Sequence, residues 1–129
     1  MEALCRIAEK GDQHAIAAVS ARLEHWDANV RSSAVEVLGQ IAEKGDQRTI
    51  TALSARLEDE NAVVRSFAVE ALGHIAEKGD QHSIAAVSAF LEDEDADVRC
   101  SAVEALAKIA EKGDQHSIAA VSALSLIHI

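Results

Sequence analysis

Histidine is the residue type in this sequence that most directly suggests metal chemistry. His14, His82 and His116 occupy one position of a repeated segment, and Arg48 fills that position in the remaining copy. A zinc ion needs several nitrogen or sulfur ligands within about 2.1–2.3 Å, whereas equivalent side chains on stacked helices lie roughly 8–10 Å apart. No cysteine or acidic residue is clearly placed to complete such a site. We therefore predict a solvated row of histidines, with no metal and no cofactor.

Arginine also recurs once in each repeat, as Arg31, Arg65 and Arg99, beside acidic segments. Such a row suits an anionic ligand, because guanidinium groups form paired hydrogen bonds with carboxylates and phosphates. The alternative is an internal ladder, in which each arginine bonds a carboxylate or a helix end of its own or the neighbouring unit. Asp and Glu outnumber Lys and Arg by 22 to 12, so acidic partners are plentiful. We favour the ladder.

Sequence patterns for nucleophilic catalysis and phosphate binding are missing. No serine lies in a Gly-x-Ser-x-Gly elbow, and no glycine-rich phosphate loop is present. Carboxylates are numerous, but acid–base catalysis needs one that is held in an apolar pocket, and the sequence shows no such pocket. We therefore predict no catalytic residues and a protein that is not an enzyme.

One repeated segment supplies the elements that position these residues. The heptad IAEKGDQ occurs four times at a constant spacing of 34 residues, beginning at Ile7, Ile41, Ile75 and Ile109. A fixed period of this length indicates stacked structural units, and the lack of proline suits a chain made almost wholly of helices. Glycine in the heptad allows a left-handed backbone and the following aspartate caps a helix. These structural positions are Gly45, Gly79 and Gly113, followed by Asp46, Asp80 and Asp114.

Each unit is predicted to contain two antiparallel helices, A and the B that follows it, which the short Gly-Asp corner joins into a hairpin. Helix A begins after the capping residues Asp27, Asn61 and Asp95, and Lys44 lies in its last turn, next to the glycine that ends the helix. Val64 and the apolar residues one turn apart after it form a buried stripe. The predicted spans are 28–44, 62–78 and 96–112 for helix A, and 13–24, 47–58, 81–92 and 115 onward for helix B.

Composition limits the classes of partner. The chain has 129 residues and a net charge of −10, so we expect it to repel nucleic acid, which binds through Lys and Arg, and anionic membranes. No apolar run approaches the length of a membrane span. Cys5 and Cys100 occupy different positions in the unit and are predicted to be free thiols in a reducing compartment. This favours an intracellular location.

Three segments carry a family resemblance: VRSSAVEVLGQIA (30–42), VRSFAVEALGHIA (64–76) and VRCSAVEALAKIA (98–110). They resemble HEAT-like repeats, of the short variety found in phycobilin lyases and many scaffold proteins. Tetratricopeptide repeats share the period, but their Trp-Leu-Gly-Tyr pattern is not found here. The resemblance implies an all-α, right-handed solenoid. The deoxyhypusine hydroxylases resemble this chain in fold and hold iron with His-Glu dipeptides, and no His-Glu occurs in this sequence.

Positions at which one copy departs from the others indicate candidate binding residues. Phe90 and Leu124 replace an arginine of the earlier copies, Trp26 replaces a glutamate of the later copies, and Phe67 replaces a serine. Apolar residues on a charged template suggest a docking patch for a partner. The alternative is that they fill local gaps or pack against a missing neighbour. We select Phe90, Leu124 and Trp26 as the candidate partner-binding residues.

The domain organisation follows from the repeat. Residues 1–124 are predicted to form one array of about 3.5 helix pairs that starts inside a helix, and 125–129 form a tail that resembles translated adapter sequence. We expect a fragment of a longer array or an accessory subunit of an assembly. The predicted function is a protein–protein interaction module or scaffold for a basic or amphipathic partner, with self-association through its open ends. The alternative is a bilin lyase-like protein that assists chromophore attachment to antenna proteins.

Overall fold

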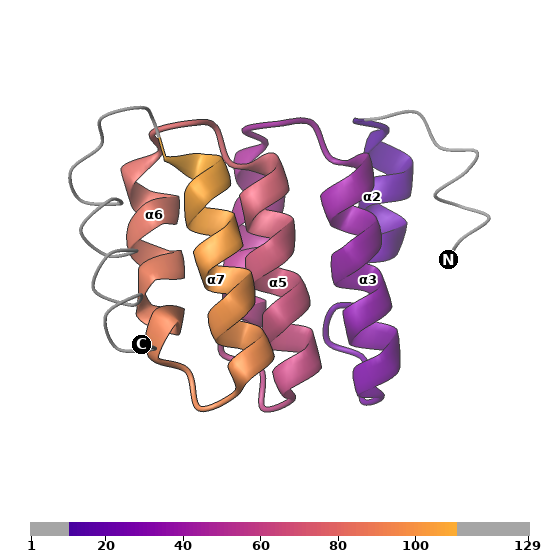
Figure 1. Ribbon diagram of the computed structural model, residues 1–129. Helices are drawn as coiled ribbons and strands as arrows, with labels where there is room; N and C mark the ends of the chain where they lie inside the picture. The colour runs from indigo at the N-terminus through magenta and orange to yellow at the C-terminus, as the bar shows by residue number, and fades with distance from the viewer. Residues whose placement is uncertain (1–10, 111–129) are drawn as a thin grey trace.

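The computed structural model describes residues 11–110, and in that range it contains six α-helices, one 3₁₀ helix and no strand. The A helices lie side by side in one layer, and the B helices pack against one side of that layer (Figure 1). The all-α expectation is confirmed, and the right-handed sense stays a prediction. The A helices are α3 (Ala28–Ile41), α5 (Ala62–Ile75) and α7 (Ala96–Ile109), and the B helices are α2 (Gln13–Ser20), α4 (Gln47–Arg56) and α6 (Gln81–Ser88), which η1 (Ala89–Glu92) follows.

Helices begin where the sequence predicts, because capping side chains define these ends. Asn61 accepts hydrogen bonds from the N–H groups of Val63 and Val64 at the start of α5, and Asp95 has the same role for α7. These bonds satisfy N–H groups that have no partner inside the helix. Asp46 differs from the prediction. It occupies the N-cap position of α4, but its side chain accepts no bond from a backbone N–H and instead accepts one from the Thr49 hydroxyl at 2.7 Å.

The predicted ends of helix A are wrong by three residues. The helices stop at Ile41, Ile75 and Ile109, and Ala42 is already extended, with φ −74° and ψ 145°. Lys44 therefore lies in an exposed turn beyond the helix and not in its last turn. Gly45 has a φ of 83° in this turn, rather than directly after the helix. Helix B also stops early, and η1 forms the last turn of the third copy.

The reason for the early stop is a contact between units. The N–H of Gly45 donates to the carbonyl of Ile75 at 2.6 Å, and Gly79 donates in the same way to Ile109. A carbonyl at the end of helix A therefore receives its hydrogen bond from the turn of the preceding unit. Such a bond between residues far apart in the sequence cannot be predicted from the residues around either partner. Gly113 and Asp114 lie outside the described residues.

The pairing of the helices also differs from the expected hairpin. The prediction joined each helix A to the helix B that follows it through the Gly-Asp corner. In the structure, α4 packs more closely against α5 than against α3, and α6 more closely against α7 than against α5. The extended residue Ala42 and the turn that follows it carry the chain across to the next unit. The closest pair is therefore a helix B with the helix A that follows it.

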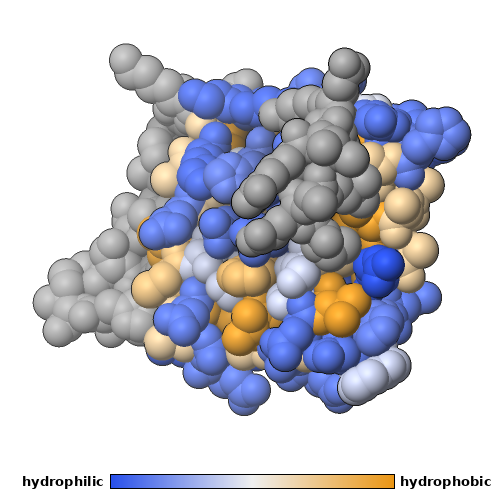
Figure 2. Space-filling view, turned by 90° about the vertical axis from the view of Figure 1, so that its right-hand side faces the viewer, coloured by the Kyte–Doolittle hydropathy of each residue, from blue (hydrophilic) through white to orange (hydrophobic). Residues whose placement is uncertain are grey.

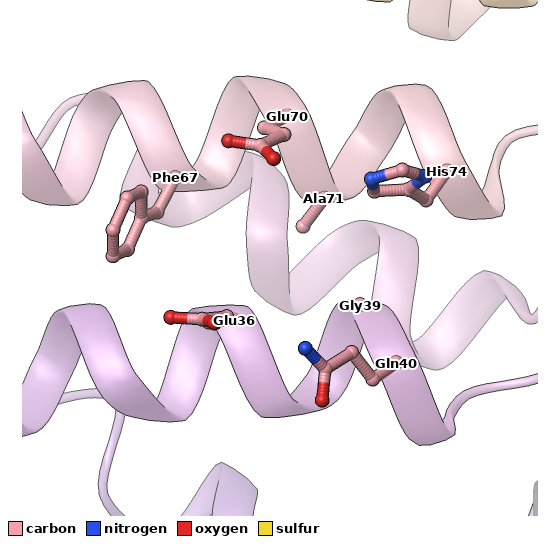
Figure 3. Close-up of a pocket in the computed structure, with 7 residues that line it drawn as sticks. All are labelled: Glu36, Gly39, Gln40, Phe67, Glu70, Ala71 and His74. Carbon is pink, nitrogen blue, oxygen red and sulfur yellow. The ribbon is translucent and has the colours of Figure 1, made fainter.

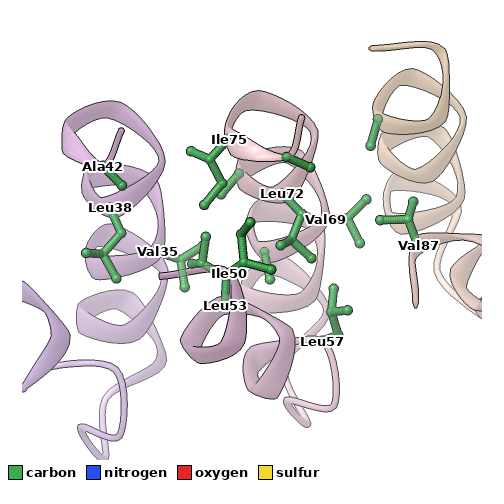
Figure 4. Packing of buried hydrophobic residues seen from close by; sticks show 14 of the residues in the cluster. Val35, Leu38, Ala42, Ile50, Leu53, Leu57, Val69, Leu72, Ile75 and Val87 are labelled. Carbon is green, nitrogen blue, oxygen red and sulfur yellow. The ribbon is translucent and has the colours of Figure 1, made fainter. Parts of the chain in front are cut away.

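One continuous apolar core runs through the described units (Figure 4). Leu38, Leu53 and Leu72 are fully buried and come from α3, α4 and α5. Burying one such side chain contributes roughly 1.5–3 kcal/mol. The stripe predicted for helix A is confirmed, since Val64 and Ile75 are buried too. None of the described helices has the length and hydropathy to cross a membrane.

Candidate partner-binding groove

The recurring arginines form an internal ladder. Arg31 binds Asp59 of the next unit, with Nε 2.8 Å from Oδ2 and Nη2 3.1 Å from Oδ1. Its Nη1 donates to the carbonyls of His25 and Trp26 in the turn of its own unit. Arg65 repeats this arrangement with Asp93. The guanidinium groups are thus occupied inside the protein, so these two arginines are not placed to grip an external anion.

The pKa values within the ladder follow from this geometry. Burial works to raise the pKa of Asp59, but the hydrogen bonds from Arg31 and from the N–H of Asn61, together with the charge of Arg31, outweigh it. The net result is a pKa below the usual range for aspartate. Asp93 behaves in the same way beside Arg65. Both carboxylates therefore stay ionised under all but acidic conditions.

A groove lies on the other side of the A layer, between α3 and α5. Its cavity is about 150 Å³, and its lining comes from only these two helices (Figure 3). The lining residues recur three or four positions apart, so they share one face of each helix. From α3 they are Glu36, Gly39 and Gln40, and from α5 they are Phe67, Glu70, Ala71 and His74.

The floor of the groove is apolar and its rim is polar. Ala71 is buried, and Phe67 and Gly39 are half-buried, whereas Glu36 and Glu70 are exposed. Figure 3 shows the Phe67 ring reaching from α5 toward the space that faces Glu36. Neither glutamate forms an ion pair within residues 11–110. The groove therefore offers an apolar surface bordered by two carboxylates that have no ion-pair partner in the described part of the chain.

The two helices approach each other closely at Gly39 and Ala71, in the floor of the groove. A Cβ atom placed on Gly39 would lie 3.0 Å from the Cβ of Ala71, which is closer than side-chain carbons normally come. Gly73 has the same relationship to Ala105 of α7. Small residues at these points let the A helices touch, and the larger Phe67 lies about one turn away on α5, where the surface is hollowed.

Comparison with protein families decides the architecture. A model of HEAT repeats matches residues 2–73 and again 50–126. The chain belongs to the HEAT-repeat family. A search of curated proteins found no match. HEAT repeats generally mediate protein–protein interaction or scaffolding, so the candidate residues of this HEAT-repeat protein are best judged as partner contacts. The narrower likeness to phycobilin lyase repeats stays a prediction.

The HEAT array places Trp26 and Phe90, two of the predicted docking residues, in different units. Trp26 is 84% exposed in the turn before α3, and its ring lies 5.3 Å from that of His25. Phe90 lies in η1, two units away, half-buried against the core. Arg56 stands at the equivalent position one unit earlier. Its side chain donates a hydrogen bond to the carbonyl of Leu23 in the preceding unit. Leu124 lies outside the described residues.

The histidines and cysteines form no grouping in the described part of the array. His14 and His82 are exposed at the starts of their B helices, as predicted. Between residues 11 and 110, no three His, Cys, Asp or Glu side chains gather to hold a metal ion. Cys100 is an exposed free thiol. Cys5 and His116 are outside the described range.

Sequence reasoning missed the groove, although one signal for it was present. Phe67 stands at the position of Ser33 and Ser101, and Val63, one turn earlier, stands at the position of Asn29 and Asp97. Only the middle copy therefore carries an apolar pair on this face. Val63 is 54% exposed, and a second hollow beside the pair is bordered by aspartates of the next unit.

Proposed function

We propose that this HEAT-repeat protein is a non-catalytic binding module whose acidic surface receives a basic or amphipathic segment of another protein. The observation that carries the proposal is the row of Glu36, Glu70 and Glu104, one on each described A helix. All three are exposed, and none is ion-paired within residues 11–110. Equivalent glutamates on stacked helices make an extended negative surface, and such a surface attracts and orients a cationic partner.

The character of the surface supports the same role. At the α2–α3 end, polar residues cover most of the described surface, with smaller apolar areas between them (Figure 2). Partner surfaces combine an apolar contact with a polar border in this way. Trp26 adds an exposed indole, a side chain that is enriched among residues with large contributions to binding. We include Trp26, Phe90 and Leu124 in the proposal as anchors for a partner.

Selection of peptides from a random displayed library tests the module. We expect enriched peptides that share Lys or Arg beside apolar residues, and saturable binding of the synthetic peptides to the purified chain. Binding should weaken as salt is raised, because the charges are exposed. Failure to enrich any sequence class would remove the proposal.

Phe90→Arg tests one anchor with a substitution that the array itself supplies. Arg22 and Arg56 occupy the equivalent position. Arg56 donates to the carbonyl of Leu23, and the carbonyl of Leu57 is the corresponding acceptor for an arginine at position 90. The variant should keep its helix content and lose affinity for the selected peptides. If circular dichroism shows that the array melts, Phe90 is a core residue and not an anchor.

The bilin lyase-like alternative has less support. A tetrapyrrole is held largely by aromatic stacking, and the only aromatic residues of the chain, apart from histidine, are Trp26, Phe67 and Phe90. Mixing the protein with a bilin and an antenna apoprotein tests it. A covalent pigment absorbance that depends on the protein would replace the binding-module proposal.

A further inference from the structure

We infer that the groove between α3 and α5 is a docking site for a basic amphipathic helix of another protein. An apolar side chain of that helix packs on Phe67, and lysine or arginine residues one turn away on it bind Glu36 and Glu70. This docking mode rests on the proposed function and gives it a location and a partner chemistry.

The shape of the groove selects the type of segment. α3 and α5 lie side by side, and the lining runs from Phe67 to His74, about two turns of α5. A ridge of side chains on a third helix fits a groove between two helices. The cavity of about 150 Å³ admits a single apolar group, since a cavity of about this size takes up benzene. The dimensions of the groove therefore match a helix that contributes one apolar anchor and two flanking cationic side chains.

The charges around the groove select the sign of the partner. Glu36 and Glu70 face the groove from opposite helices, and neither forms an ion pair in the described part of the chain. Lysine and arginine have long apolar stems that pack on an aromatic floor while the charged group reaches the rim. An acidic helix would be repelled at the same two points and by the net charge of −10.

The neighbouring position in the array lacks these features, which makes the groove specific. Between α5 and α7, Ser101 takes the place of Phe67, and its hydroxyl lies 2.7 Å from that of Ser66. Lys108 takes the place of His74 and adds a positive charge. The third unit therefore keeps the glutamate, has no aromatic residue at the Phe67 position and carries an additional positive charge.

The probe for the test is a labelled 14-residue helical peptide of leucine, lysine and alanine with the leucines on one face. Binding to the whole chain is measured by fluorescence anisotropy. Phe67→Ser introduces the residue of the other two copies and should weaken binding about tenfold or more, the effect of losing a central apolar anchor. The double variant Glu36→Gln/Glu70→Gln should weaken it by a similar factor and reduce the salt dependence.

Matched controls make the result specific to the groove. Glu58→Gln removes an exposed charge that belongs neither to the groove nor to the row of glutamates on the A helices, and it should change the affinity less than about twofold. The same peptide with glutamate in place of lysine should not bind. Circular dichroism of each variant should match that of the unmodified chain, and for any variant that does not, Phe67→Leu provides a smaller change that still reduces the aromatic surface.

The outcomes separate this docking mode from the broader proposal. If the lysine peptide binds equally well to Phe67→Ser and to the glutamine double variant, the groove is not its site. If peptides from the displayed library bind but the lysine peptide does not, the module stands and this partner chemistry is wrong. If neither the library nor the lysine peptide yields binding, both proposals fall.

Discussion

Arg31 and Asp59 connect successive units through two parallel hydrogen bonds of 2.8 and 3.1 Å. The side chains are only 10% and 5% exposed. The third nitrogen of the guanidinium donates to the turn before α3. One arginine thus joins the turn of its own unit to the turn of the next, so a change at either residue leaves the other charge buried without its partner.

Asp59→Asn is expected to lower the free energy of unfolding by about 3 kcal/mol, because it leaves the buried Arg31 without an anion. Urea denaturation followed by circular dichroism measures the change. Glu58→Gln, which removes an exposed charge one residue earlier, should alter stability by less than about 0.5 kcal/mol. Equal stability of the Asp59 variant and the unmodified chain would show that the Arg31–Asp59 ion pair does not contribute to the free energy of unfolding.

The two ladder aspartates should make stability depend on pH in the acid range. Their pKa values in the folded chain lie below those of the unfolded chain, which are about 3.9. Unfolding therefore favours proton uptake, so their contribution is complete above about pH 4 and is lost as the pH falls through the folded pKa values. The difference in unfolding free energy between the unmodified chain and Asp59→Asn/Asp93→Asn should narrow below pH 4. A difference that stays constant from pH 7 to pH 3 would contradict this.

Gly45→Ala should destabilise the fold by about 1–2 kcal/mol, the usual cost of a left-handed backbone at an L-residue. Gly45 has a φ of 83°, and a Cβ there would lie 2.7 Å from Oε1 of Glu77. Thermal and urea unfolding measure the effect. Lys44→Ala, in the same turn, is the matched control and should be nearly neutral, because Lys44 lies beyond the end of α3. If Lys44→Ala lowered the stability as much as Gly45→Ala, the lysine would stabilise the helix end as the sequence predicted.

Gly39→Val should cost about 1–3 kcal/mol, because the added methyl groups enter a space already filled by Ala71. Ala107→Val makes a comparable change at the equivalent and exposed position of α7, where only the lower helix propensity of valine counts. Urea denaturation of both variants checks the comparison. If the two substitutions cost the same, the close approach of α3 and α5 does not restrict the residue at 39.

The sequence predicted the features that depend on nearby residues. Asn61 and Asp95 identify helix starts because each cap contacts its own backbone two or three residues later. The ends of helix A escaped prediction because the carbonyl of Ile75 is bonded by Gly45, from another unit. The groove escaped for the same physical reason, since Glu36 and Phe67 are far apart in the sequence and meet only when α3 packs on α5.

Two of the contacts between units lie at opposite ends of the A helices, with Arg31 and Asp59 near the starts and Gly45 and Ile75 near the ends. A joint fixed at two separated points resists torsion far more than a joint fixed at one. We therefore expect these two contacts, together with the shared core, to restrict rotation of one described unit against the next. A displacement imposed on one described unit is then expected to be transmitted to its neighbour, as in a stiff spring, instead of being absorbed at a hinge.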